Sequence, residues 1–389
     1  MAETGKAAQE LQPCLVAWRR RLHTLAEVGM DLPRTKAFLE DALKEMGLVP
    51  RHLGAGLAVD LTGEKPGKAL AIRSDMDALP LREETGLPFA CPDEAVHACG
   101  HDAHMAMLLG AAALLAERRE ALSGTVRFLF QPGEEQGRGA ANLIAAGALW
   151  GMDGICGLHV GRLFPELGSG QVGVRSGTAM ASMDRFEVLL RGKATHGALP
   201  HQGIDPIVMA GEFVGALQTL VSREIPAVRP AVVSLGRIQG GSAFNIIPGE
   251  VRLEGTFRAV TPEDREFLAR RVEELARGVA ALHGGEAEVL WEKGAPPVVN
   301  HRGFTEAFRR SAGKILPPED LVDLEAPTLV GEDMALYLER LPGTFFFLGG
   351  GEGAPHHHPQ FDLDEEVLWR GTALFVRFAL DFCSGAEVP

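Results

Sequence analysis

The sequence predicts an α/β protein with a mostly parallel sheet, interrupted by an inserted α+β domain of ferredoxin-like pattern. The length of 389 residues exceeds the size at which one hydrophobic core usually stops growing, so two domains are expected. Strand-like and helix-like segments alternate in residues 1–179, which indicates a parallel sheet. Between residues 180 and 293 the order changes to strand, helix, strand, strand, helix, strand. We expect residues 294–389 to rejoin the first domain.

The first domain should begin with helices and continue with short strands. Apolar residues recur at helical spacing in residues 11–48, which predicts one or two helices. The apolar run Met105–Leu115 predicts a buried helix. Turn residues and β-prone stretches predict strands at 56–61, 69–73, 124–130 and 154–158. Three of these strands end at an acidic residue or a histidine, and ligands bind beyond the carboxyl ends of strands in such sheets.

The inserted domain and the last segment are assigned in the same way. The alternation of apolar and polar residues in 186–192 predicts an antiparallel strand with one solvent-exposed face. One helix is expected from about Asp205 to Glu224, and a second follows the cap at Thr261 and runs to about His283. The other expected strands of this domain are 231–238, 249–259 and 287–292. The last segment holds further helix, a strand at 344–349 and a final helix from Glu365.

Charge and composition exclude several partners. The formal charge of −14 offers no basic field for nucleic acid or an anionic membrane. No apolar run approaches the roughly 18 residues that span a bilayer, and the N-terminus lacks the apolar core of a signal peptide. Five cysteines in a chain of this length do not form a disulfide framework. A cytoplasmic protein is therefore expected.

The segment His97–His104 contains three histidines, a cysteine and an aspartate within eight residues. Imidazole, thiolate and carboxylate groups are the side chains that bind zinc and similar divalent ions. The apolar helix that follows would hold such ligands rigidly at its mouth. A capped helix start with satisfied polar groups is the alternative interpretation.

Further polar residues lie where strands end. Asp75 and Asp77 end one strand, and Glu134-Glu135 follows another behind a Pro-Gly pair. Adjacent carboxylates on an extended backbone point in different directions, so that one can ligate a metal while the other faces water. The alternative is an acidic turn capped by Asp75 in the first place and a solvated acidic turn in the second.

Histidines near two other strands are weaker candidates. His159 ends an apolar strand, where a histidine is more often a satisfied core residue than a ligand. The triplet His356–His358 follows a glycine-rich loop, and only one of its members need have a role.

The inserted domain adds His196, Asn245 and Arg258. Histidine and asparagine can stabilise an oxyanion, and arginine can bind a carboxylate through two hydrogen bonds. A structural salt bridge is the alternative for Arg258. The sequence contains neither a phosphate-binding glycine loop nor a Gly-x-Ser-x-Gly elbow.

Taken together, these residues resemble the aminoacylase/carboxypeptidase family of dinuclear metallohydrolases, metallopeptidase family 20. The resemblance is closest to the amidohydrolase subgroup that includes hippurate hydrolase, N-acyl-amino-acid amidohydrolases and indole-acetyl-amino-acid hydrolases. The family's His-x-x-Pro-Glu motif appears as His23–Glu27 without the proline, and His23 is assigned no role. The matching blocks are Arg73–Pro80, His97–His104, Phe130–Glu135, Gly157–His159, Gly192–Gly197, Asn245–Pro248, Gly255–Arg258 and His357–Asp362.

The resemblance implies a site with two divalent ions per subunit, zinc or manganese, with cobalt and nickel as further candidates. Glu134 would be the general base, and Asp77 would orient a ligand from outside the metal's own ligand set. The inserted domain would act as a lid and dimerisation surface, with His196 steadying the oxyanion in its own or a neighbouring subunit's site. Asn245 and Arg258 would hold the substrate carboxylate. The implied metal ligands are Cys99, His101, Glu135, His159 and His357.

The expected activity is hydrolysis of the amide bond of N-acyl-L-amino acids by a metal-activated water with a glutamate base. A carboxypeptidase acting on short peptides is the alternative enzyme. A non-catalytic metal-binding protein of the same fold is an alternative from another class, which an intact Glu134 beside an intact ligand set argues against. A homodimer or a higher homo-oligomer is expected.

Overall fold

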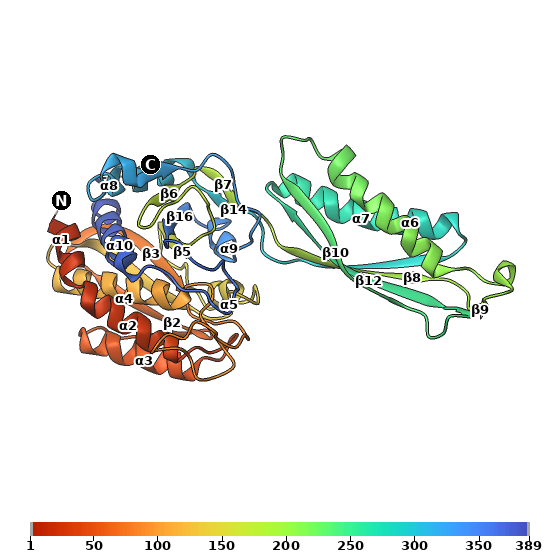
Figure 1. Ribbon diagram of the computed structural model, residues 1–389. Coiled ribbons are helices and arrows are strands. Elements are labelled where there is room, and N and C mark those ends of the chain that lie inside the picture. Colours follow the sequence, from red (N-terminus) through yellow and green to blue (C-terminus); the bar gives the residue numbers. More distant parts are fainter. Residues whose placement is uncertain (1–2, 387–389) are drawn as a thin grey trace. The chain divides into compact units, whose positions relative to one another are not determined.

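The computed structural model describes residues 3–386, and their internal contacts divide the chain into two units (Figure 1). The first unit contains the residues up to Ala179, then Val298–Thr328, and then the chain from Asp333. The second unit contains Met180–Pro297 and Leu329–Glu332. No helix within residues 3–386 is both long and apolar enough to cross a membrane.

The first unit is built on an eight-stranded sheet with the order β1-β2-β4-β3-β5-β16-β6-β15. The four central strands β4, β3, β5 and β16 run parallel, whereas β1, β2 and β6 make antiparallel pairings. The strands are β1 Arg51–Leu53, β2 Gly56–Thr62, β3 Lys65–Asp75, β4 Ser123–Gln131, β5 Gly154–Gly161, β6 Val172–Val174, β15 Leu321–Asp323 and β16 Gly343–Gly349. A separate pair joins β7 Gly177–Met180 to β14 Val298–Asn300.

Helices cover this sheet. α4 and α10 pack against β3, and α2 packs on α4 (Figure 1). α4 is buried along nearly its whole length, which explains why its sequence shows no polar stripe. A Cβ at Gly110 would lie 2.5 Å from the Leu15 side chain, so glycine permits the close approach of α2. The helices are α1 Glu3–Glu10, α2 Gln12–Thr24, α3 Pro33–Glu45, α4 His101–Glu117, α5 Gly139–Ala145, α8 Arg302–Ala312, α9 Met334–Leu338 and α10 Leu368–Cys383.

The second unit is an antiparallel sheet with the order β10-β12-β8-β13, and helices α6 and α7 pack against it. Along the chain these elements follow the strand-helix-strand-strand-helix-strand order. The Thr261 side chain caps α7 by accepting a hydrogen bond from the Asp264 backbone N–H. The elements are β8 Asp184–Arg191, α6 Pro206–Thr219, β10 Ala231–Gly240, β12 Glu250–Ala259, α7 Pro262–Leu282 and β13 Glu286–Glu292, with a small pair of β9 Thr195–His196 and β11 Ile246–Ile247.

Three details differ from the sequence-based expectations. α4 begins at His101, so the end of the His97–His104 segment is helical. Strand β5 continues past His159 to Gly161 instead of ending there. Residues 294–389 do not all belong to the first unit, because 294–297 and Leu329–Glu332 belong to the second. There the Val330 carbonyl accepts a hydrogen bond from Ala181 N–H.

Candidate metal centre

Five residues from separate segments of the first unit meet beyond the carboxyl ends of its parallel strands. Cys99 precedes α4 and His101 begins it, Glu135 follows β4, His159 lies near the end of β5, and His357 follows β16. The potential ligand atoms of Cys99, Glu135 and His357 all lie within 4.8 Å of one another. Cys99 Sγ is 3.4 Å from His159 Nε2, and His101 Nε2 is 3.9 Å from Glu135 Oε1. The structure therefore brings the sequence-predicted ligand set together.

Backbone carbonyls fix the orientation of two of these imidazoles. His101 Nδ1 lies 2.8 Å from the carbonyl oxygen of Asp77, and His159 Nδ1 lies 3.0 Å from that of Val160. Because a carbonyl can only accept, each Nδ1 is the protonated nitrogen. Each Nε2 then presents a lone pair to the cluster, as a metal-ligating histidine does.

The backbone at His357 is unusual. Its φ of 63° makes it the one non-glycine residue with positive φ in the described part of the chain. Its N–H donates to the Ala98 carbonyl at 2.8 Å, and its Nε2 lies 3.4 Å from Glu135 Oε2. Non-glycine residues rarely occupy this region, and such strain is often found at functional sites. The conformation directs this imidazole to the cluster.

Glu135 provides the test of whether a cation fits. Its Oε1 is buried and makes no hydrogen bond to any residue within 3–386, which is costly for a carboxylate unless a cation compensates it. Burial alone would raise the pKa of Glu135, but the hydrogen bond to His357 and the charge of His101 hold that pKa below its ordinary value. Nitrogen, oxygen and sulfur donors around one small space suit zinc and related divalent ions. The residues fit the metal.

Asp77 binds the backbone of the Glu134-Glu135 turn through two hydrogen bonds. Its Oδ1 accepts from the Glu134 N–H at 3.0 Å, and its Oδ2 accepts from the Glu135 N–H at 3.2 Å. Burial raises the pKa of Asp77 to about 6. The carboxylates of Glu134 and Glu135 both approach His101, with potential ligand atoms within 4.8 Å, so they do not point apart as the extended-backbone argument predicted. The turn, and not the strand, determines their direction.

Three buried residues beside the cluster, Arg73, Asp75 and His104, contact one another and the backbone of β5. His104 Nδ1 lies 2.6 Å from Asp75 Oδ1, and His104 Nε2 accepts from the Val160 N–H at 2.9 Å. Both ring nitrogens are therefore occupied by protein groups. Arg73 Nη1 donates to the other oxygen of Asp75 at 2.9 Å. These contacts join α4, β3 and β5 next to the ligands.

The three consecutive histidines have three different environments. His356 is mostly buried against His159, with ring centroids 5.1 Å apart, and its Nε2 accepts from the Arg162 N–H. Burial lowers the pKa of His356 to about 3. His358 is exposed, and its Nδ1 accepts from the Gln360 N–H. His357 alone of the three is directed at Glu135. Sequence alone could not separate them, because the separation depends on one backbone torsion.

The candidates of the second unit are exposed or half-buried and fall into two places. His196 pairs with Ile246 in the β9–β11 ladder, and the Asn245 carbonyl accepts from the Gly197 N–H, so His196 and Asn245 are neighbours. Arg258 lies near the far end of β12, eight residues beyond Glu250, or roughly 26 Å at about 3.3 Å per residue. Within one copy of this unit, Asn245 and Arg258 are therefore too far apart along the sheet to bind one small carboxylate together.

Arg258 is half-buried and donates from Nη1 to Thr256 Oγ1 at 3.0 Å. Among the residues that the structure describes, it forms no salt bridge. The structural salt bridge that the sequence left open is thus not found there. A guanidinium of this kind retains donors for a ligand carboxylate.

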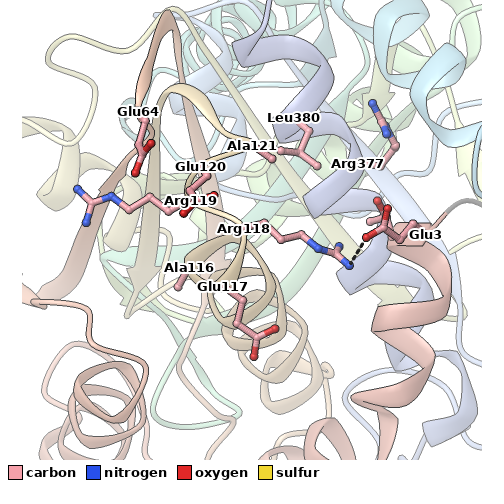
Figure 2. A pocket seen from close by; sticks show the side chains of 11 residues that line it. Glu3, Glu64, Ala116, Glu117, Arg118, Arg119, Glu120, Ala121, Arg377 and Leu380 are labelled. Atoms are coloured by element: carbon pink, nitrogen blue, oxygen red, sulfur yellow. Dashed lines mark ion pairs between the residues drawn. The ribbon is translucent and has the colours of Figure 1, made fainter.

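A surface hollow of about 640 Å³ lies at the other end of α4 (Figure 2). Arg118 and Glu3 face each other across it at 3.6 Å. Its lining contains carboxylates and guanidiniums but no histidine or cysteine. The seventeen residues from His101 to Glu117 correspond to about 25 Å of helix, so the hollow is separate from the ligand cluster.

Comparison with known proteins gives consistent matches. The family model described as peptidase family M20/M25/M40 matches residues 71–381. An N-acetyl-L-cysteine deacetylase of Bacillus subtilis (strain 168) is 42% identical over 361 residues, covering 92% of this chain and 85% of that protein. A protein of Saccharolobus solfataricus named thermostable carboxypeptidase 1 is 34% identical over 386 residues, covering 96% of each chain.

Solved structures agree with this fold over the full length. A crystal structure from methicillin resistant Staphylococcus aureus has a TM-score of 0.93 at 31% identity, covering 99% of this chain and 100% of that chain. A Bacillus subtilis protein described as a dinuclear metal binding peptidase from the M20 family has a TM-score of 0.84 at 36% identity, covering 95% and 98%.

Proposed function

Because the chain belongs to peptidase family M20/M25/M40 and is a metal-dependent hydrolase, we propose that it hydrolyses the amide bond of N-acyl-L-amino acids. The observation that best supports this function is the convergence of five donor residues from distant segments beside Glu134. The relative named N-acetyl-L-cysteine deacetylase supports an acylated amino acid as the substrate class.

We propose two divalent ions per subunit, zinc or manganese, with cobalt and nickel also compatible with the donors. Cys99, His101, Glu135, His159 and His357 would hold them. The close approach of these donors and the buried Oε1 of Glu135 support this assignment. The bound ions would polarise the scissile carbonyl and make the attacking water more acidic.

The remaining chemistry is assigned to side chains. Glu134 accepts a proton from the attacking water and then donates it to the leaving amine. Asp77 orients Glu134 and Glu135 through the two backbone N–H groups that it accepts. His196 stabilises the oxyanion of the tetrahedral intermediate, and Arg258 holds the free α-carboxylate of the substrate.

We propose that the second unit, an inserted domain at about residues 180–293, is a lid and dimerisation surface. The separation of Arg258 from His196 and Asn245 along β12 supports a homodimer, in which one substrate meets groups from two copies. Phe244 is fully exposed beside Asn245, which suits an apolar contact between subunits. All five cysteines are thiols, which supports a cytoplasmic location.

Hydrolysis assays test the proposed function. Purified protein is incubated with N-benzoylglycine, N-acetyl-L-cysteine and an unblocked dipeptide, with and without a chelator. We expect release of the free amino acid from the acylated substrates, loss of this activity with chelator, and recovery when Zn²⁺ or Mn²⁺ is added. Activity that persists after complete metal removal contradicts the proposal.

A carboxypeptidase is the second candidate, favoured by the relative named thermostable carboxypeptidase 1. In that case the dipeptide is cleaved faster than the acylated amino acids in the same assay. If no substrate of either class is cleaved although the protein binds metal, the non-catalytic hypothesis replaces both.

A further inference from the structure

Arg19 of α2 is fully buried and bonds to three different carboxylates. It is 1% exposed. Its Nε donates to Asp102 Oδ2 at 2.8 Å, its Nη2 to Asp362 Oδ1 at 2.7 Å, and its Nη1 to Glu365 Oε1 at 3.0 Å. A buried guanidinium needs such partners because its desolvation costs several kcal/mol. The planar fork fixes the directions of all three carboxylates.

Two of these carboxylates belong to segments that hold proposed metal ligands. Asp102 directly follows His101 in the first turn of α4. Asp362 lies five residues after His357, and its backbone carbonyl accepts from Arg162 Nη1 at 2.8 Å. The three nitrogens of Arg19 therefore connect the start of α4 to the segment between β16 and α10. Asp102 and Asp362 make no contact with the ligand cluster's donor atoms among the contacts described for residues 3–386.

A buried histidine contacts the same Asp102 oxygen that Arg19 binds. His23 Nδ1 lies 2.8 Å from Asp102 Oδ2, and His23 Nε2 lies 3.1 Å from Glu83 Oε2. The side chains of Arg19, Asp102, His23 and Glu83 are each at most 1% exposed. The hydrogen bonds that link these four groups hold them fixed in the interior.

We propose that Arg19 is a positioning residue for the metal centre. It sets the relative positions of His101 and His357 by binding Asp102 and Asp362, so that both imidazoles reach the same pair of ions. The inference rests on the proposed function only in taking these two histidines as ligands. His23, which Glu83 holds through its other ring nitrogen, binds the same Asp102 oxygen as Arg19 and helps to fix that carboxylate.

Cobalt binding tests this role without measuring turnover. The metal-free wild type and the variants Arg19→Lys, Arg19→Met and Asp362→Asn are titrated with Co²⁺ against a competing chelator, and the visible spectrum is recorded. Loss of a partner that orients a ligand typically costs about 10- to 100-fold in metal affinity. We expect a loss of this size for both Arg19 variants, a smaller one for Asp362→Asn, and altered cobalt bands in each.

Arg20→Met is the matched control. Arg20 is the next residue of α2 and binds Glu365 at 2.6 Å, but it is half-exposed and does not contact Asp102 or Asp362. We expect wild-type cobalt affinity and spectrum for this variant. Kinetics on an N-acyl amino acid should show a lower kcat for Arg19→Lys with KM little changed, because Arg19 does not touch the substrate.

The outcomes separate positioning from simple stabilisation. If Arg19→Lys folds with a lower Tm but keeps wild-type cobalt affinity and spectrum, the positioning role is wrong. If both Arg19 variants fail to fold, Asp362→Asn decides: weaker cobalt binding supports the role, and unchanged binding overturns it. The wild type's activity on N-acyl amino acids tests the proposed function independently, since the cobalt comparison needs no substrate.

Discussion

The candidate residues of the two units differ in how firmly they are held. In the first unit, His101 and His159 are buried, and each has its second ring nitrogen fixed by a carbonyl. In the second unit, His196 and Asn245 are exposed, and Arg258 keeps unused donors. Buried ligands with fixed orientations suit a metal ion, which needs a defined coordination geometry. Accessible groups suit a substrate that enters and leaves. Substitutions in the first unit should therefore affect metal and kcat, and those in the second should affect KM.

The largest expected effect is on kcat in Glu134→Gln. Removing a general base costs about 10²- to 10⁴-fold, while Cys99 and the other proposed ligands are untouched. Steady-state kinetics and metal analysis measure both quantities. Glu64→Gln, an exposed change in the same unit, is the control. A variant with normal kcat would remove Glu134 from the mechanism and with it the assignment of chemistry to this unit.

Two buried cysteines of the first unit give the next comparison. Cys99→Ala should weaken metal binding by more than the about 10- to 100-fold that an outer partner costs, because a ligand itself is lost. Cys156→Ala changes an equally buried thiol of β5 that belongs to no cluster of potential ligands found among residues 3–386. Metal content after gel filtration should fall in the first variant only. Equal metal content in both variants would show that Cys99 is a buried thiol and not a metal ligand.

In the second unit, Arg258→Ala should raise KM for N-acyl amino acids and leave metal content unchanged. A hydrogen bond to a charged group contributes about 1.5–3 kcal/mol, which corresponds to about 10- to 100-fold in KM. A contact present in both ground and transition states changes KM more than kcat. Arg252→Ala, on the same strand but paired with Glu187, is the control. A fall in kcat at constant KM would contradict the assignment of KM effects to the second unit and kcat effects to the first.

The smallest expected effect is on stability and concerns His23. Burial alone would lower its pKa, but hydrogen bonds to Asp102 and Glu83 raise it to about 9, against 6.5 for the ordinary group. The folded state therefore binds the proton more tightly than the unfolded state. The stabilisation, at most about 3 kcal/mol, is fully present below pH 6.5 and is lost as the pH rises through about 9.

Urea unfolding of the metal-free protein between pH 6 and 10 measures this dependence. The free energy of unfolding should fall with pH more steeply in the wild type than in His23→Gln. Parallel curves would show that His23 does not stay protonated in the folded state.

Most of the first unit could be predicted from the sequence because its strands are continuous apolar runs. The predicted strands at 124–130, 154–158 and 344–349 correspond to β4, β5 and β16. The candidate ligands could be recognised from the residue types near the ends of these strands. The three-residue strands β6 and β15 were not predicted, because so short a segment has no periodicity. His23 was assigned no role, since nothing in its neighbouring residues shows that Asp102 and Glu83 flank it.

The arrangement of the second unit was only partly predictable. Its order of strands and helices follows from alternation and caps, including the Thr261 cap. The separation of Asn245 from Arg258 depends on both being placed along the β10–β12 hairpin, where one lies near the turn and the other eight residues along the strand from Glu250. The resemblance implies that both residues hold the substrate carboxylate, and the length of β12 separates them within one copy.

The position of β16 in the sheet has a consequence for biosynthesis. This strand comes from the last fifty residues of the chain, yet it lies between β5 and β6, and the segment after it contains His357. Until the ribosome has made it, one edge of β5 has no neighbour, and an open apolar edge invites pairing with other chains. Metal binding through the proposed ligand His357 must then wait until this strand and the segment after it have been made. A message truncated before codon 343 would yield an aggregation-prone product that lacks this ligand.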